Sequence, residues 1–435
     1  MIPLIIILSL SFLEDNESHT ICVPRLGTFG MPVEVCSGEW YPHAECLFMQ
    51  PWCRLGADWT LRPGIARSWS IRNGHFILVL SENAAVYMSE SGGFSDTSVT
   101  PMSSHIVSIT VESGWPQLLQ APEERSEDTM IVGFGGYDIQ QWVREQHIIL
   151  TRNNPDRVGP DNIMVTACAS RERMVEGFVS GEFDMIDDIS FEERALLCGN
   201  EDHYTCFARR SNSLLYLMWN STCLDVSDPA IRSVLGQAVD RKRLAARVGS
   251  RPSWITPCPL PPRVPGSWST LPVVMDTAGT DIHIPESITI LTEPRWEAVQ
   301  AGKEVKTDIS HLGVDVRLVT SDQWIRDPMY MHETAAIIGV WEVEPNAILP
   351  PSPRGWDDPL SLSRTACEIT TYPTSDIWIA VSERLQSAFV EDMGMVCFCW
   401  LSRWAAVDTS WSVPDPGPGP LDGQIDRWTF GEMKQ

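Results

Sequence analysis

The sequence predicts an α/β protein of two lobes. Its 435 residues are too many for one ordinary hydrophobic core and enough for two lobes of roughly 150 to 200 residues each. Apolar residues make up 43% of the chain and aromatic residues 9%, which is typical of a globular protein. The part of the chain up to Arg152 has mainly β character, whereas a strand, helix, strand unit over 287–320 is of the kind that builds a parallel sheet.

The N-terminal third is predicted to be rich in strands. Residues 61–84 read as two strands joined at Asn73 and Gly74, the pair that best tolerates the positive φ angles of a type I′ turn, and so predict a hairpin. The segments HIVSITV, YDIQQW and HIILTR continue this β character up to Arg152. After a loop, NIMVTACA is the next predicted strand.

Two amphipathic helices are predicted in the middle of the chain. The segment 170–181 has apolar residues at i, i+3 and i+4 spacing, ends at a glycine, and is followed by the short strand FDMIDDI. Residues 227–249 form the clearest helix of the sequence. Ser227 is its N-cap candidate, Pro229 suits its first turn and Gly249 ends it.

A second α/β stretch follows a proline-rich loop. The strands SITILT and VDVRLVT flank the helix PRWEAVQAGKEVKTDISHL, and TAAIIGVWEVE adds a further strand. After a long loop, SDIWIAVSERLQSAFVEDM is another amphipathic helix. The Pro/Gly-rich tail from Ala405 onward is expected to pack back as strands and turns.

Three glycines, Gly133, Gly135 and Gly136, follow an apolar run in TMIVGFGGYDIQQW and raise the question of a phosphate-binding loop. A dinucleotide fingerprint needs a third glycine three residues past the second, and a helix after it. Asp138 stands at that position, and the residues around it favour a strand. We therefore interpret the stretch as strand, glycine turn and strand, not as a nucleotide site.

The net charge argues against nucleic acid as a partner. Asp and Glu number 57 against 32 Lys and Arg, which gives a formal net charge of -25. Affinity for nucleic acid comes largely from basic residues that neutralise phosphates, and no long block of basic residues concentrates the positive charge of this sequence. The acidity instead indicates a solvated surface.

The N-terminus indicates export to the periplasm or the cell surface. Residues 1–13 form an apolar run followed at once by acidic residues. The run is too short to span a bilayer but has the length of the hydrophobic region of a secretory signal. No basic residue precedes it, and the alternative interpretation is a buried first strand.

The cysteine content predicts disulfides in an exported chain. The sequence has 12 cysteines, and four of them lie within 22–53. No C-x-x-C pair exists, so no zinc site is expected, and Cys397 and Cys399 lie on an apolar, strand-like run. The spacing does not give the connectivity of the cysteines.

Searches for catalytic motifs give no positive result. HETAA at 332–336 begins like a zinc-protease helix, but Ala336 stands where the second histidine would have to lie. GFVSG at 177–181 has its serine in the wrong position for a nucleophile elbow, and AGKE at 301–304 lacks the residues that flank a Walker lysine. The acidic cluster over 184–188 is more simply explained as a solvated strand end. The sequence thus predicts neither an enzyme nor a bound cofactor.

Six short motifs occur in a fixed order along the chain. From N- to C-terminus, they comprise Pro63, Ala66, Ser68, Trp69 and Gly74 around the hairpin, Gly133 to Tyr137, Arg152 to Arg157, Ser180 with Gly181 and Asp184, Asn220 to Arg241, and residues 312–316. In this order they resemble the family 5 extracellular solute-binding proteins, the large receptors of peptide, nickel and related ABC importers. The resemblance covers residues 55–435, with a shortened segment between Ala84 and Gly133.

The resemblance implies a two-lobe fold of the periplasmic-binding-protein type, a class II flytrap with mixed sheets flanked by helices. Lobe 1 is expected over 14–208 and 398–435 and lobe 2 over 209–397, after a signal segment over 1–13. Ligand would bind between the lobes and shift the equilibrium between open and closed forms toward the closed form.

The resemblance also implies where a peptide would bind. Peptide-binding members carry W-x-x-D at a strand end, and the aspartate meets the α-ammonium group of the ligand; here Trp341 and Glu344 have that spacing. A carboxylate forms a charge-assisted hydrogen bond with an ammonium group, and a glutamate would do so one methylene further out. Trp356 and Asp357 in GWDDP are a rival alignment for the same motif. The alternative for Trp341 is a core position, with Glu344 solvated.

The expected function is that of a substrate-binding receptor for an ABC importer. Its ligand would be an oligopeptide or another small solute, its partner a permease in the membrane, and its working state a monomer. The alternative is a flytrap domain used for ligand sensing and not for transport, whereas a secreted hydrolase has no catalytic constellation behind it. Glu344 or Asp357 beside tryptophans in a cleft would favour the receptor, and a cleft filled by side chains the sensory role.

Overall fold

A six-stranded mixed sheet is the largest element of the structure, which is a computed structural model. The structure describes residues 28–34, 52–55, 60–72, 75–81, 85, 99–103, 105–110, 136–143, 146–153, 160–168, 170–189, 193–194, 197, 203–249, 254–268, 282–321, 333–343, 348–350, 356, 374–412 and 429–430. The strand order in the large sheet is β11 (Met185–Ile189), β16 (Met395–Asp408), β12 (Tyr204–Trp219), β15 (Ala336–Glu342), β13 (Ser287–Thr292) and β14 (Asp315–Thr320).

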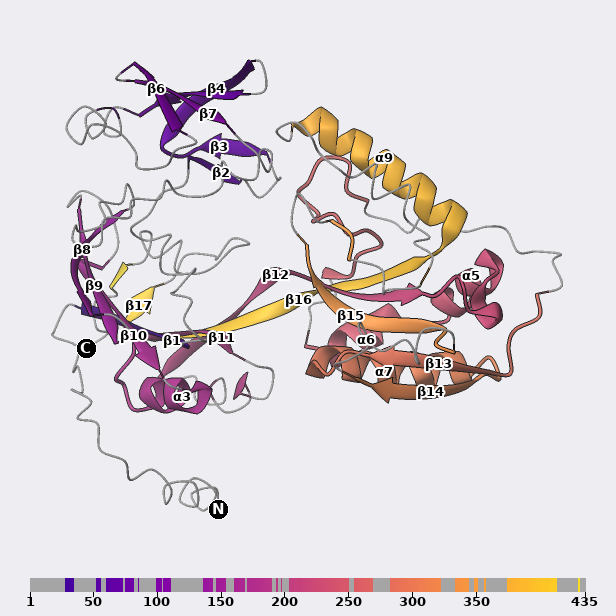
Figure 1. Cartoon of the computed structure of the whole chain (residues 1–435). Coiled ribbons are helices and arrows are strands. Elements are labelled where there is room, and N and C mark those ends of the chain that lie inside the picture. Colours follow the sequence, from indigo (N-terminus) through magenta and orange to yellow (C-terminus); the bar gives the residue numbers. More distant parts are fainter. Residues whose placement is uncertain are drawn as a thin grey trace.

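Two long antiparallel strands, β12 and β16, connect the two lobes of the molecule. In Figure 1 they run from one group of elements to the other. The predicted lobe boundaries, after residue 208 and after residue 397, fall within these strands. The exact boundaries stay a prediction.

The first lobe contains two four-stranded sheets. One has the order β4 (Ala66–Arg72), β5 (His75–Leu80), β7 (Ile106–Thr110) and β6 (Val99–Ser103). The predicted hairpin is confirmed, because β4 and β5 pair antiparallel with Arg72 opposite His75. The two turn residues, Asn73 and Gly74, lie outside the described residues.

The other four-stranded sheet has the order β1 (Thr28–Glu34), β10 (Asn162–Cys168), β9 (His147–Arg152) and β8 (Tyr137–Val143). β8 confirms the strand predicted after the glycine turn, whereas Gly133 and Gly135 lie outside the described residues. The predicted helix that follows is α3 (Arg171–Val179). The hydroxyl of Ser170 accepts a hydrogen bond from the N–H of Arg173 and so caps the N-terminus of α3.

Short strand pairs complete the described part of this region. They are β2 (Cys53–Leu55) with β3 (Leu61–Pro63), and β17 (Trp411–Ser412) with β18 (Thr429–Phe430). The second pair confirms that part of the C-terminal tail forms strands.

The second lobe contains the predicted strand, helix, strand unit. β13 pairs in parallel with both β14 and β15, and the connection between β13 and β14 contains α7 (Trp296–Ser310). The other helices are η3 (Leu224–Val226), α5 (Pro229–Gln237), α6 (Arg241–Arg247) and α9 (Ser375–Asp392). Figure 1 shows α9 on one side of the sheet and α6 and α7 on the other.

The sheet of the second lobe therefore separates two hydrophobic cores. The α7 core joins Leu215, Leu217 and Trp219 of β12 to buried residues of α5, α6 and α7. The α9 core joins Leu214, Tyr216 and Met218 to Trp378, Val381 and Leu385 of α9. Alternate residues of a strand point to opposite faces, which explains why β12 supplies both cores and has few polar residues in this part.

The prediction of one continuous helix over 227–249 is wrong. The helix is interrupted after α5, and Asp240 begins α6 by accepting hydrogen bonds from the N–H groups of Lys242 and Arg243 at 3.0 and 3.1 Å. An aspartate satisfies the unpaired N–H groups of a first helical turn, so it starts a new helix where the amphipathic pattern alone continues.

The start of α5 also differs from the prediction. Asp228, and not Ser227, is the N-cap, because its carboxylate accepts a hydrogen bond from the N–H of Ala230 at 2.8 Å. Pro229 occupies the first turn as predicted. Gly249 follows α6 with a φ of 71°, a conformation that suits a residue without a side chain.

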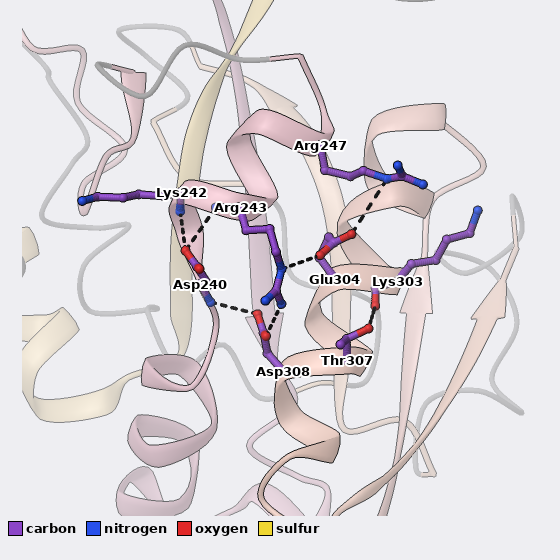
Figure 2. A network of polar contacts seen from close by, with 8 residues as sticks. All are labelled: Asp240, Lys242, Arg243, Arg247, Lys303, Glu304, Thr307 and Asp308. Atoms are coloured by element: carbon purple, nitrogen blue, oxygen red, sulfur yellow. Dashed lines mark hydrogen bonds and ion pairs between the residues drawn. The ribbon is translucent and has the colours of Figure 1, made fainter.

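A polar network holds α6 against α7 (Figure 2). Arg243 pairs with Asp308 and donates from Nε to Glu304 at 2.8 Å. Asp308 is buried and also accepts from the N–H of Asp240 at 2.9 Å. Arg247 lies further from Glu304, with Nε 3.8 Å from the carboxylate. The same aspartate thus contacts both the start of α6 and the side chain of Arg243.

Five described cysteines have free, buried thiols. They are Cys53, Cys168, Cys223, Cys258 and Cys397. The predicted disulfides are therefore not confirmed at these positions.

Within the placed segments, no helix has the length and apolar character needed to cross a membrane. The apolar N-terminal run over 1–13 lies outside those segments, and its role as a signal stays a prediction.

Candidate functional site

The carboxyl ends of β13 and β15 lie close to the point where β12 passes from one lobe to the other. At the end of β15, Glu342 lies opposite Ser213 of β12. From Tyr204 to Arg210, β12 pairs with β16 and no longer with β15, and β16 in turn pairs with β11 next to the first lobe. Ligands commonly bind outside the carboxyl ends of strands in open α/β sheets. This end of the sheet is therefore the candidate site.

Glu293 occupies the carboxyl end of β13. β13 pairs with β15 as far as Thr292, opposite Ile338, and then ends while β15 continues. The N–H of Glu293 still donates to the carbonyl of Ile338 at 3.0 Å. Its carboxylate oxygen Oε2 accepts from the N–H of Val340, also at 3.0 Å. The side chain thus satisfies a backbone group that the ended strand no longer reaches.

Gly339 leaves room for this carboxylate. A Cβ atom at Gly339 would lie 2.7 Å from Glu293 Oε1 and 2.9 Å from the hydroxyl oxygen of Tyr216. Tyr216 lies directly opposite Gly339 on β12. Among the described residues, none donates a hydrogen bond to Oε1. Oε2 therefore accepts a hydrogen bond from the backbone, and Oε1 lies near the phenol of Tyr216.

The electrostatic setting of Glu293 disfavours its charged form. Burial is the largest effect and raises the pKa of the carboxyl above its ordinary value. The hydrogen bond from the N–H of Val340 and the positive charge of Arg295 lower the pKa and partly oppose this effect. A positively charged group brought to Oε1 would further favour the ionised carboxylate.

Trp341 lies two residues beyond Gly339 on the same face of β15. It is opposite Leu214 of β12 and packs, half-buried, against the α9 core. Trp254 and Trp268 are partly buried against the same core. Trp341 is thus partly a core residue, as the alternative interpretation expected, and keeps part of its surface exposed near the end of the sheet.

The structure brings the two predicted tryptophans to one core. Trp356 is only 8% exposed and belongs to the α9 core, against which Trp341 packs. Its indole N–H has no hydrogen-bond partner among the described residues. Glu344 and Asp357 lie outside the described residues, so their predicted contact with a ligand stays a prediction.

These groups suit recognition of a ligand. A carboxylate accepts hydrogen bonds and attracts cations, a phenol both donates and accepts, and a tryptophan offers a large aromatic face. A second glutamate, Glu342, is exposed and accepts from the hydroxyl of Ser213 at 2.8 Å. In the segments that the structure places, no three His, Cys, Asp or Glu residues gather in a way that could hold a metal ion.

Sequence reasoning missed Glu293, Tyr216 and Gly339. For Glu293 a signal was present, because an acidic residue directly follows the predicted parallel strand SITILT. For Tyr216 and Gly339 there was no local signal. They meet only through the register of β12 and β15, which are far apart in the sequence.

The fold is similar to that of solved binding proteins. CtaP from Listeria monocytogenes, an ABC transporter substrate-binding protein, superposes with a TM-score of 0.68 at 12% identity, over 93% of this chain and 99% of that chain. MppA, a periplasmic murein tripeptide binding protein in its unliganded open form, gives 0.67 at 13% identity, over 92% and 95%. EppA, a periplasmic EDTA-binding protein, gives 0.64 at 12% identity, over 93% and 97%.

The comparisons establish the fold class. No family model matches the sequence, and no curated protein shows significant similarity to it. The structural likeness confirms the predicted two-lobe, periplasmic-binding-protein-like fold with mixed sheets and flanking helices.

Proposed function

We propose that the protein is an extracytoplasmic solute-binding receptor that delivers its ligand to an ABC importer by closure of the two lobes. The observation that carries this proposal is the group of side chains at the carboxyl ends of β13 and β15. There Glu293, Tyr216 and Trp341 combine a carboxylate, a phenol and an indole near the connection between the lobes. The fold shared with CtaP, an ABC transporter substrate-binding protein, supports the same role. No enzymatic activity is proposed.

The proposed ligand is an oligopeptide. Trp341 with Glu344, or alternatively Trp356 with Asp357, would contact its N-terminal residue, and the carboxylate would receive its α-ammonium group. The W-x-x-E spacing supports this assignment, as does the name of MppA, a murein tripeptide binding protein. EppA, which has a similar fold, is an EDTA-binding protein, so a screen for the ligand must also include compounds other than peptides.

The proposal also includes the organisation of the chain. Residues 1–13 would direct export and be removed, 14–208 with 398–435 would form lobe 1, and 209–397 would form lobe 2. The receptor would act as a monomer in the periplasm or at the cell surface, and would present the ligand to a membrane permease. The long strands β12 and β16 would carry the hinge, because they are shared by both lobes (Figure 1).

A thermal-shift screen of the purified chain tests the proposal. The probes are di- to octapeptides, nickel chelates and small sugars. A ligand at a hundred times its dissociation constant should stabilise the protein by about 2.7 kcal/mol, which raises the melting temperature visibly. For a peptide hit, Glu344→Ala and Asp357→Ala are compared, because the two rival alignments predict that a different one of them abolishes the shift.

A well-folded protein that responds to no probe would contradict the receptor. The sensory alternative would then gain support. A response to nickel chelates or sugars alone would keep the receptor and remove the peptide as its ligand.

A further inference from the structure

The charge of Glu293 is not required by its structural contact. Oε2 accepts the N–H of Val340 at 3.0 Å, and the neutral amide oxygen of a glutamine would accept the same hydrogen bond. Withdrawing an ionised carboxylate from water costs free energy unless a cation or several donors compensate for the lost hydration. Among the described residues, no basic side chain forms an ion pair with Glu293. Arg295 lowers the pKa of the carboxyl through its positive charge, but in the described part of the chain no cation contacts the carboxylate directly.

The second carboxylate oxygen lies near the hydroxyl of Tyr216, a residue that is 2% exposed. Oε1 and the hydroxyl oxygen of Tyr216 both lie within 3 Å of the place that a Cβ of Gly339 would take, at 2.7 and 2.9 Å. Trp341 is on the same face of β15, two residues nearer to the carboxyl end. Two acceptor oxygens beside an aromatic side chain are the surroundings that cationic groups prefer in proteins.

We propose that Glu293 and Tyr216 bind an ammonium or guanidinium group of the solute, with Trp341 contacting the adjoining alkyl part. The inference rests on the proposed function, because it names the ligand chemistry of the same end of the sheet. It adds a cation-binding position at the carboxyl end of β13 to the one that the sequence predicts at Glu344 or Asp357. It also predicts that a positive charge on the solute strengthens binding.

Calorimetric titration of the purified full chain with three tripeptides tests this inference. Trialanine carries an α-ammonium group, N-acetyl-Ala-Lys-Ala carries only a side-chain ammonium group, and N-acetyl-trialanine carries no cation. Each is titrated into the wild type, Glu293→Gln, Tyr216→Phe and the control Glu383→Gln. Glu383 is an exposed residue of α9, so its substitution removes a carboxylate of the same kind from the surface of another element.

We expect a loss that depends on the cation. At least one cationic tripeptide should bind the wild type, and Glu293→Gln should weaken it about tenfold to a hundredfold, because a charge-assisted hydrogen bond becomes a neutral one. Tyr216→Phe should give a smaller loss for the same peptide. N-acetyl-trialanine should respond to neither change, and Glu383→Gln should leave all three affinities unaltered.

Three results would overturn the inference. An equal loss for the cationic and the uncharged peptides would mean that Glu293 acts only through the fold, and no loss would mean that it does not meet the ligand; both leave the receptor standing. A wild type that binds no tripeptide would overturn the peptide receptor and this inference together. If Glu293→Gln fails to fold, Gly339→Ala must give the same cation-dependent loss, because its added methyl displaces the carboxylate and leaves it in the chain.

Discussion

At Gly339, the absence of a side chain decides where a carboxylate lies. The glycine is in the middle of β15, in a sheet interior where glycine weakens a strand by having nothing to pack. Its presence is explained by the close approach of Glu293 and Tyr216, whose oxygen atoms occupy the space that a methyl group would need. A locally unfavourable residue thus permits an arrangement that a larger one would exclude.

Gly339→Ala is expected to separate ligand binding from stability. The new Cβ would lie 2.7 Å from Glu293 Oε1 and 2.9 Å from the hydroxyl of the buried Tyr216, and the carboxylate is the end of a flexible side chain that can move aside. The free energy of unfolding should change by no more than about 1 kcal/mol, because the alanine also restricts the unfolded chain. The affinity for a cationic tripeptide should fall. Urea unfolding measures the stability, and calorimetric titration measures the affinity.

Gly177→Ala is the matched control for this change. Its added Cβ would collide with the ring of Phe183 in the first lobe, far from the site. Its cost should be about 1–3 kcal/mol of stability with affinity retained. The opposite pattern, a destabilised Gly339→Ala protein with unaltered affinity, would mean that the carboxylate does not depend on this glycine.

Glu293→Gln is expected to stabilise the ligand-free protein in a pH-dependent way. Burial raises the pKa of Glu293 in the folded state, so the folded protein binds its proton more tightly than the unfolded chain does. The stability that this proton contributes is full below the unfolded pKa and is lost as the pH rises through the folded pKa. The variant, which cannot ionise, should therefore be more stable than the wild type at about pH 7 and gain little at about pH 4.

Urea unfolding of the ligand-free proteins at both pH values measures this difference. Arg295, whose charge lowers the same pKa, and Tyr216 stay in place in both proteins. Glu383→Gln, which alters an exposed residue, should show no such dependence on pH. A variant that is less stable than the wild type at the higher pH would show that ionised Glu293 stabilises the ligand-free protein. The inference that its charge is compensated only by a bound cation would then fail.

The candidate site could be predicted from the sequence only in part. The W-x-x-E pattern led to Trp341, which lies at the carboxyl end of β15 and on the face of Gly339. The pattern could not lead to Glu293, since its meaning depends on β13 ending two residues before β15 reaches Val340. The point at which one strand ends beside another depends on how the two strands pair in the folded sheet. The local sequence of either segment does not determine it.

The break between α5 and α6 shows a similar limit at the level of elements. The strands β4, β5, β7 to β11 and β13 to β15, and the helix α7, were predicted from their residue patterns, and the structure places them where the pattern does. The strands β1, β2, β6 and the long β12 were not predicted. Over 227–249 the periodicity also continues, but Asp240 adds a cap that competes with it. The capping aspartate was visible in the sequence. Its contact with α7, where Asp308 accepts a hydrogen bond from the N–H of Asp240, was not visible there.

Asp308→Ala should loosen the contact between α6 and α7. Asp308 is 5% exposed, and its loss would leave the N–H of Asp240 without its acceptor and Arg243 without one of its two carboxylates (Figure 2). Hydrogen bonds to a charged group such as this buried carboxylate contribute about 1.5–3 kcal/mol to the free energy of unfolding, and we expect a loss of this size. Chemical denaturation followed by circular dichroism measures this loss.

Arg247→Ala provides the comparison within the same network. Its Nε lies 3.8 Å from Glu304 and its side chain is 56% exposed, so its removal should cost at most about 0.5 kcal/mol. If both variants lost the same stability, the buried aspartate would have no special part in joining the two helices.

For the whole molecule, the two long strands decide what kind of motion is available. β12 and β16 pair with each other along both lobes, and their register shifts between Arg210 and Leu214, at the passage from one lobe to the other. Such irregularities weaken the ladder locally and let strands bend. A bend at this point would change the angle between the lobes while each sheet keeps its own pairs.

Closure predicts that ligand makes the molecule more compact. A ligand shifts the equilibrium between open and closed forms only if it contacts the closed form better, which a site at the connection between two lobes achieves by touching both. The radius of gyration measured by small-angle X-ray scattering should therefore fall when a binding tripeptide saturates the protein. Because Glu293 belongs to the second lobe, Glu293→Gln should require more peptide but reach the same final radius. Binding without any change in radius would contradict closure, and a smaller final change in the variant would make Glu293 part of the closing contact itself.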